Sequence, residues 1–153
     1  MQVSANDVQI RNNNIQKNDV FFTPTSETPD DIGHAMVIEE TLVNTVYSYH
    51  LMRYRPHTDV YYSIFPNYCF NTENIRKQMA FMAQGVQRYV LSKTQFENII
   101  VLVPSMDEQM KIAEMLRSLD GLIKLHQRKL TEMIEYKNSL SQLLLTGIVR
   151  VWL

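Results

Sequence analysis

Residues 105–147, SMDEQMKIAEMLRSLDGLIKLHQRKLTEMIEYKNSLSQLLLTG, carry both ends of one very long predicted helix. Ser105 and Glu108 form an S-x-x-E capping box, in which each side chain accepts a hydrogen bond from the other residue's backbone N–H. Gly147 supplies the left-handed residue that commonly ends a helix. An unbroken helix over residues 106–145 would be roughly 60 Å long, at 1.5 Å per residue.

An apolar seam runs along this predicted helix in alternating steps of four and three residues. Eight of its ten positions are apolar, a pattern typical of a coiled coil. The rest of the chain is too small to bury so long a seam, so we expect pairing with another long helix, in the simplest case within a homodimer. His126 and Lys137 are the two polar seam positions and would set its register. The predicted pairing residues are Ile112, Leu116, Leu119, Ile123, Leu130, Met133, Leu140 and Leu144.

The weakest point of the predicted helix is Gly121. An interior glycine costs up to about 1 kcal/mol relative to alanine, so the helix could bend there.

The remaining chain has the patterns of a small α+β domain. Proline and glycine residues punctuate its predicted strands, which are 19–25, 35–40, 45–55, 86–92 and 98–104. Two helices are predicted between them, at 58–65 and 71–85. Thr58 would cap the first, which would end near Pro66, whereas Asn71 would cap the second and Gly85 would close it.

These elements predict an α+β fold, with a small mixed or antiparallel sheet, short helices and one long coiled-coil helix. The expected organisation is a domain at 1–104, the long helix at 105–147 and a tail at 148–153.

Composition narrows the class of protein. The 153 residues carry a formal net charge of −1, which gives no overall attraction to nucleic acid or membranes. The N-terminal stretch lacks the apolar core of a signal peptide, and no apolar run is long enough to span a bilayer. A single cysteine, Cys69, excludes an internal disulfide and fits a reducing compartment. We expect a cytoplasmic protein that does not associate with membranes.

Motifs for catalysis are absent from the sequence. The four histidines and Cys69 do not have the spacing of a zinc site. No Gly-rich phosphate loop, G-x-S-x-G motif or methyltransferase cofactor loop is present. Cys69 lies among aromatic residues and is interpreted as a buried apolar thiol. The sequence predicts neither a cofactor nor enzymatic activity.

Binding motifs are more informative. The segment TPTSETPDDIGH, residues 23–34, carries many hydroxyl groups that suit a polar surface, although an ordinary solvated loop would look the same. Arg and Lys residues adjoin tyrosines in RYR, at 53–55, and in GVQRYVLSK, at 85–93. Cations interleaved with aromatic residues suit contacts with phosphates and base edges.

From Gly85 onwards the sequence resembles DNA-specificity (S) subunits of type I restriction-modification systems. Such chains show a glycine-led turn, a strand ending in proline, an EQ-led long helix with lysines, and a final L-l-t-G. Upstream, KNDVFFTPTSE and VYSYHLMRYRP resemble two further segments of the family, with Asn18 where a glycine is usual. The matching positions after the turn are Gly85, Leu91, Ser92, Phe96, Ile100, Val101, Pro104, Glu108, Gln109, Ile112, Ala113, Leu116, Leu119, Asp120, Ile123, Lys137, Leu144 and Gly147.

The resemblance implies a non-catalytic role. An S subunit holds two target recognition domains apart on an antiparallel pair of long helices. Each domain reads one half of a split site in double-stranded DNA, and the helices dock the methyltransferase (M) subunits of a complex that also contains restriction (R) subunits.

One recognition domain and one helix would make this chain half a subunit that pairs with a second half or with itself. From the family pattern we expect its first strands to be missing, so a coiled-coil interaction protein or silent fragment that no longer binds DNA is the alternative. The residues expected to face DNA are Thr23, Thr25, Ser26, Arg53, Arg55, Gln84, Gln87, Arg88 and Lys93.

Overall fold

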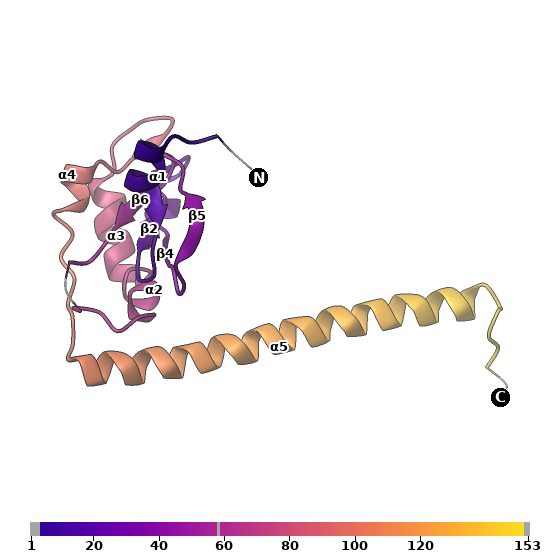
Figure 1. The fold of residues 1–153 in the computed structure, drawn as a ribbon. Helices are drawn as coiled ribbons and strands as arrows, with labels where there is room; N and C mark the ends of the chain where they lie inside the picture. Colours follow the sequence, from indigo (N-terminus) through magenta and orange to yellow (C-terminus); the bar gives the residue numbers. More distant parts are fainter. Residues whose placement is uncertain (1–3, 58, 152–153) are drawn as a thin grey trace. The chain divides into compact units, whose positions relative to one another are not determined.

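The computed structural model of the chain describes residues 4–57 and 59–151, and its α+β architecture confirms the predicted fold class (Figure 1). The chain forms two compact units, Met1–Ala113 and Glu114–Leu153. The elements are α1 (Asp7–Asn13), β1 (Asn14–Ile15), β2 (Val20–Phe22), β3 (Thr25–Ser26), the 3-10 helix η1 (Pro29–Asp31), β4 (Ala35–Val37), β5 (Leu42–Val46), β6 (Met52–Tyr54), α2 (Phe65–Cys69), α3 (Glu73–Met82), β7 (Tyr89–Val90), α4 (Lys93–Phe96) and α5 (Met106–Leu145).

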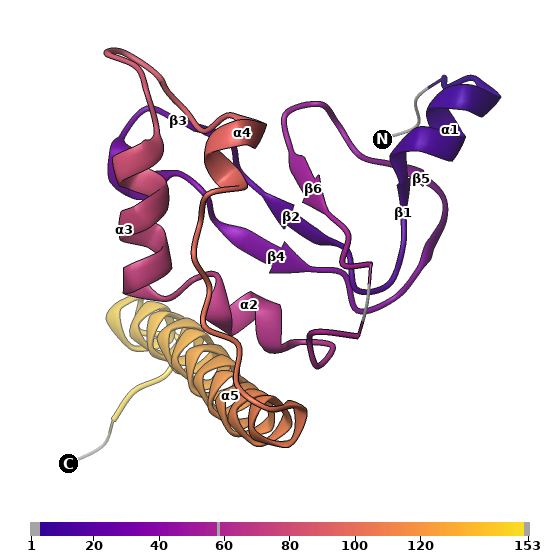
Figure 2. The same cartoon turned by 90° about the vertical axis from the view of Figure 1, so that its left-hand side faces the viewer.

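An antiparallel sheet with strand order β4–β2–β6 forms the centre of the first unit (Figure 2). In the register of this sheet, Phe21 lies between Met36 and Arg53. All three residues of β2 are buried, as expected for a central strand covered on both faces. Two further antiparallel pairs, β1–β5 and β3–β7, lie beside this sheet.

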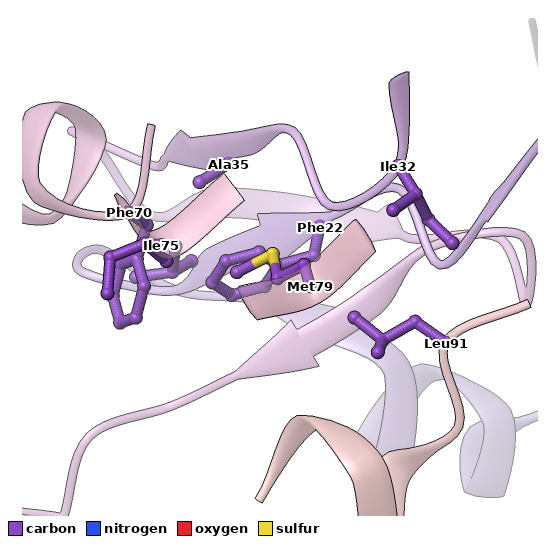
Figure 3. Close-up of a cluster of buried hydrophobic side chains, with 8 residues drawn as sticks. Phe22, Ile32, Ala35, Phe70, Ile75, Met79 and Leu91 are labelled. Carbon is purple, nitrogen blue, oxygen red and sulfur yellow. The ribbon is translucent and has the colours of Figure 1, made fainter. Parts of the chain in front are cut away.

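The hydrophobic core lies between this sheet and α3 (Figure 3). Ile75 and Met79 are one helical turn apart on α3, and both are buried against the sheet. Phe22 from β2 meets Phe70 edge to face, with ring centroids 5.1 Å apart. Leu91, from the segment that follows β7, closes the same cluster.

A buried ion pair holds the start of β2 to the end of β6. The side chain of Asp19 is fully buried, and Arg55 donates to it twice, from Nε at 2.6 Å and from Nη2 at 2.7 Å. The backbone N–H of Gln16 also donates to this carboxylate, at 2.8 Å. The bond to Asp19 raises the pKa of the Arg55 guanidinium above its ordinary value.

The predicted helix at 58–65 is wrong in its position. Thr58 lies outside the described residues, and the helix that forms, α2, begins at Phe65. Pro66 stands in the first turn of α2, where a residue without a backbone N–H is tolerated, so it begins a helix and does not end one.

The helix predicted at 71–85 forms, with shorter bounds. Thr72 occupies the N-cap position, because the Asn71 side chain is used elsewhere: it accepts a bond from the Ala35 N–H and donates to the Ala35 carbonyl. Gly85 does not close α3, which ends at Met82.

Several predicted strands are shorter or divided. The range 45–55 spans the end of β5, a turn in which the Leu51 N–H donates to the Ser48 carbonyl, and β6. The range 19–25 contains β2 and the first residue of β3, and 86–92 contains only the two residues of β7. Two short helices, α1 and α4, were not predicted.

The segment 98–104 forms no ladder with any strand that the structure describes. In place of a strand, the side chain of Gln78 binds both backbone groups of Ile100, at 2.9 and 3.0 Å. The strand prediction there is wrong. Two residues of this apolar run, Ile100 and Leu102, are exposed.

The long helix is confirmed as one element of 40 residues, which continues through Gly121 (Figure 1). Gly147 follows its end with φ of +73°, as the predicted stop requires. Within the described part of the chain, no helix is long and apolar enough to cross a membrane.

Candidate functional site

A small hairpin follows α3 and lies beside β3 (Figure 2). Gln84 and Val90 exchange two backbone hydrogen bonds, of 3.0 and 2.8 Å, and so close the loop between them. On its other side the returning strand β7 pairs with β3, where Thr25 faces Val90 and Ser26 faces Tyr89. Chain segments about sixty residues apart in sequence are thereby brought into one surface.

The conformation of this hairpin depends on Gly85. Its φ is +144°, and a Cβ atom built there would lie 2.0 Å from the backbone oxygen of Arg88. No other residue fits this turn without moving its backbone. At its tip Val86 is 95% exposed, and the side chains of Gln87 and Arg88 are exposed as well.

The helix α4 follows the hairpin directly. Ser92 caps it with a capping box: its hydroxyl accepts from the Gln95 N–H at 3.3 Å, and the Gln95 side chain accepts from the Ser92 N–H at 2.7 Å. Lys93 is exposed on the first turn, 3.8 Å from Glu97. We call Thr25, Ser26, Gln84, Gln87, Arg88 and Lys93 together the hairpin surface.

Thr23 lies just before this surface, and its hydroxyl is already engaged. The oxygen accepts a bond from the His34 N–H at 3.0 Å. The ring of His34 in turn lies 2.9 Å from Asp31 and 3.2 Å from Arg76 of α3. Burial lowers the pKa of the Arg76 guanidinium, which also donates to the Asp30 carbonyl. These contacts anchor the 23–34 loop to α3.

Arg53 and Arg55 lie apart from the hairpin, on and just after β6, and both are engaged within the protein. Arg53 donates to the carbonyl of Asn14 at 2.8 Å and stacks over the Tyr47 ring at 5.1 Å. Arg55 binds Asp19 as described above.

A cavity of about 780 Å³ opens beside β6 and links these arginines to α4. Arg53, Arg55 and Lys93 all contribute to its wall, together with four aromatic side chains, Tyr54, Tyr61, Phe70 and Phe96. Burial is the main cause that raises the pKa of the Tyr61 phenol to about 12. Among the described residues, no three His, Cys, Asp or Glu side chains lie close enough together to hold a metal ion.

The beginning of α5 belongs to the globular unit. Gln109 is buried, and its amide makes three hydrogen bonds to backbone: it accepts from the Tyr62 N–H at 2.9 Å and donates to the carbonyls of Val60 and Pro104, each at 3.0 Å. Ala113, one turn later, is fully buried in a cluster with Ile64 and Phe65. Every hydrogen-bonding group of the Gln109 amide is therefore used.

Beyond Ala113 the apolar face of α5 is open. Of the predicted pairing residues only Leu116 is half-buried, and the others are exposed. Seven of them have exposed fractions between 36% and 59%. Further large apolar side chains flank this seam, namely Met115, Leu122, Tyr136 and Leu143.

Comparison with known families decides the identity of the chain. Residues 4–136 match the family described as the type I restriction modification DNA specificity domain. The chain belongs to this specificity-domain family. The match covers the globular unit and most of α5, so the resemblance inferred from the sequence is confirmed.

Two relatives of this family come from Methanocaldococcus jannaschii. The type I restriction enzyme MjaVIII specificity subunit is 29% identical over 84 residues, which are 55% of this chain and 20% of the relative. The putative type I restriction enzyme MjaX specificity subunit is 29% identical over 77 residues, 50% of this chain and 18% of the relative. The aligned segments therefore span about a fifth of the length of either relative.

The structure of this specificity-domain chain also reveals two residues to which the sequence assigned no role. Gln109 matched the family pattern, but two of its three backbone partners, Tyr62 and Val60, lie 47 and 49 residues away, so these contacts are not visible in sequence. Val86 is an apolar residue at a fully exposed hairpin tip. The glycine before it and the basic residue two positions after it are the only local indication of a turn that presents side chains outward.

Proposed function

We propose that this chain is a non-catalytic DNA-specificity component of a type I restriction-modification system. The observation that carries the proposal is the family match together with the hairpin surface, on which six of the nine predicted DNA-facing residues lie. Adenine methylation and ATP-driven cleavage would be carried out by partner M and R subunits.

In this proposal the hairpin surface reads part of a split target in double-stranded DNA. Arg88 and Lys93 are exposed cations suited to phosphate contacts, which set position and orientation. The amides of Gln84 and Gln87 and the hydroxyls of Thr25 and Ser26 are suited to base edges. Val86 adds an apolar group of the kind that contacts a thymine methyl.

Arg53, Arg55 and Thr23 enter the proposal in a supporting role. Their polar groups are engaged with Asn14, Asp19 and His34, so each would act by holding the surrounding backbone in place. A direct DNA contact by either arginine would require it to exchange these partners.

The helix α5 would serve as the pairing and docking element. Its open apolar face supports pairing with the equivalent helix of a second half or of a second copy, and the paired helices would dock the M subunit. The proposed organisation keeps 1–104 as the recognition part, 105–147 as the helix and 148–153 as a tail.

Exchange of the recognition part tests this proposal. Residues 1–104 would be replaced by another recognition domain while 105–153 is kept, and methylation would be measured with an M subunit and, if needed, a second half. Gln109 of α5 bonds to backbone groups of the recognition part. Another recognition domain with the same local backbone path can therefore make these bonds to the helix. We expect the methylated sequence to change with the exchanged domain. An unchanged target would refute the proposal.

A DNA titration at several salt concentrations tests the placement of the surface. Loss of one phosphate contact in Arg88→Ala should weaken binding and reduce the salt slope by about one. Lys111→Ala is the matched control, because Lys111 is an exposed cation on α5. Equal effects of the two substitutions would place the DNA-binding surface elsewhere.

The alternative function is that of a coiled-coil interaction protein without DNA binding. The exposed seam of α5 favours it, since that seam alone would account for association. Dimerisation with no DNA binding at low salt would support this alternative over the specificity role.

A further inference from the structure

The cavity beside β6 lies at the open edge of the central sheet. β6 pairs with β2 on one side, and no other strand that the structure describes pairs with it. The three residues of β6 and the next residue, Arg55, all line the cavity. Successive side chains of a strand point to opposite faces of the sheet, so a cavity that touches four consecutive residues lies along the strand edge. Such an edge presents backbone N–H and C=O groups that no neighbouring strand uses.

The apolar wall of the cavity consists of side chains that also pack on the hydrophobic core. Apart from Phe70, which is buried, each is half-buried, because it contacts the core cluster and also lines the cavity. These half-buried side chains are Met52, Tyr54, Tyr61, Phe96, Ile99 and Val101. The rings of Tyr54, Tyr61 and Phe70 contact one another, with centroids 5.8 to 6.4 Å apart. Aromatic side chains held in this way by the core offer a fixed surface on which a flat ring can stack.

The polar part of the cavity wall is mainly basic. Its basic side chains are Arg53, Arg55, His57 and Lys93. Glu97 is the only acid among the described residues that line the cavity, and it lies 3.8 Å from Lys93 in an exposed pair of the kind that contributes little. Asp19 neutralises Arg55, whereas Arg53 contacts a backbone carbonyl and an uncharged ring, so its positive charge is not balanced by them. This excess of basic groups suits an anion.

We propose that this cavity binds a single nucleotide, either free or unpaired within a DNA strand. The base would stack on the aromatic side chains, and its polar edge would bond to the open backbone groups of β6. The phosphate would bind to His57 and Lys93, while Arg53 and Arg55 keep their partners within the protein. The volume of about 780 Å³ lies within the range of roughly 300 to 1,000 Å³ that is typical of small-molecule sites.

A nucleotide matches each part of the cavity wall, which simpler ligands do not. An apolar ligand would leave the basic side chains without a counter-charge, and a small anion would leave the aromatic side chains without a contact. The site goes beyond the proposed function, because it requires no reading of duplex DNA by the hairpin surface. Lys93 belongs to both the cavity and the hairpin surface, so the two adjoin.

Calorimetric titration of the full-length chain with deoxyadenosine 5′-monophosphate tests the proposal. Deoxyadenosine and inorganic phosphate are the two partial probes. Deoxyadenosine should bind about tenfold weaker or more, because it lacks the charge-assisted hydrogen bonds of the phosphate. Inorganic phosphate should also bind more weakly than the nucleotide, since it cannot stack. Phosphate that binds as tightly as the nucleotide would mean a site for anions alone and would overturn the proposal.

Two adjacent isoleucines provide a matched pair of variants that locate the site. Ile99 lines the cavity, whereas Ile100 does not line it and is 70% exposed. Ile99→Trp should fill part of the cavity and abolish nucleotide binding, and Ile100→Trp should leave binding unchanged. Equal effects of the two substitutions would place the nucleotide elsewhere and overturn the proposal.

A second matched pair uses exposed histidines, whose replacement does not disturb the core. His57 lines the cavity and His50 does not. His57→Glu should weaken binding of the nucleotide but not of deoxyadenosine, because the new carboxylate repels only the phosphate. His50→Glu should change neither. This pair decides the question if Ile99→Trp fails to fold, and equal effects of the two histidine substitutions would contradict the site.

A DNA duplex with one unpaired nucleotide distinguishes the two sources of the ligand. If the source is DNA, this duplex should bind more tightly than its fully paired form, and Ile99→Trp should remove the difference. If the source is the free nucleotide, the two duplexes should bind equally while deoxyadenosine 5′-monophosphate binds. A chain that binds neither the free nucleotide nor the unpaired position overturns the proposal. Binding of the fully paired duplex and methylation in the domain exchange are measured separately, so the specificity role can survive this failure.

Discussion

Replacing Arg55 tests whether this arginine stabilises the fold or contacts DNA. Arg55→Ala removes two charge-assisted bonds to Asp19 and two longer bonds to Asn14, and it leaves the carboxylate of Asp19 buried without its counter-ion. Breaking a buried ion pair on one side costs about 3 to 5 kcal/mol. Because a third of the Arg55 side chain is exposed, we expect the lower end, about 3 kcal/mol.

The loss is large relative to the whole stability of such a domain, which is about 5 to 15 kcal/mol. With a urea dependence of about 1 to 3 kcal/mol per molar, the unfolding midpoint should fall by about 1 to 3 M. Aromatic circular dichroism, measured in a Trp152→Leu background, follows mainly the globular unit, since every Phe and Tyr except Tyr136 precedes Glu114.

Two variants serve as controls for this experiment. Asp19→Asn should lower the free energy of unfolding by less than Arg55→Ala does, because the unpaired guanidinium of Arg55 can still reach water. Arg88→Ala should leave the midpoint unchanged while it weakens DNA binding. The reasoning is refuted if Arg55→Ala unfolds at the wild-type urea concentration, and a simultaneous loss of DNA affinity would then assign Arg55 to the DNA contact.

Three further outcomes are expected. Gln109→Leu should lower the free energy of unfolding by about 2 to 4 kcal/mol, because it leaves buried backbone groups unpaired. Hydrogen exchange should also quicken at the start of α5, and unchanged exchange there would contradict the role of the Gln109 amide. Gly121→Ala should stabilise the helix by up to about 1 kcal/mol without altering association in sedimentation, whereas a changed association state would mean that this position faces a partner. Ultraviolet difference spectra should show Tyr61 ionising near pH 12, a signal that Tyr61→Phe lacks. Since its folded pKa lies above the unfolded value of about 10, the contribution of Tyr61 to the free energy of unfolding should be complete below pH 10 and should fall as the pH rises from 10 to 12. A phenol titrating at pH 10 would show that Tyr61 is not buried.

The elements that sequence predicted well are those decided by local patterns. The long helix has its periodic seam, a start at Met106 just after Ser105, and a left-handed Gly147 after its end. The helix α3 has two buried positions one turn apart, Ile75 and Met79, and needs no distant residue to specify it.

The errors arose where the environment of a residue overrode its local pattern. Pro66 can end or begin a helix, and here it stands in the first turn of α2, with buried residues both before it, at Phe65, and after it, at Cys69. The range 98–104 has the composition of a strand, yet strand formation needs a neighbour, and the groups bound to Ile100 come from the side chain of Gln78.

Sequence could group only those residues of the candidate site that share a local pattern. Residues near one turn, such as Gln87 and Arg88, could be grouped from sequence because they share that turn. The engagement of Arg55 could not be foreseen, because its partner Asp19 lies thirty-six residues away and is recognised only through burial.

The attachment of Gln109 and Ala113 to the globular unit has a consequence for how α5 forms. Starting a helix is disfavoured by a factor of about a thousand, or about 4 kcal/mol, since several residues must be fixed for the first hydrogen bond. Once the globular unit is folded, the bonds of Gln109 to Val60, Tyr62 and Pro104 hold the first turn in helical geometry. Residues 114–145 then extend an existing nucleus, one hydrogen bond at a time. Helix growth is thereby coupled to folding of the domain, and in the unpaired chain α5 should unwind from Leu145 inwards.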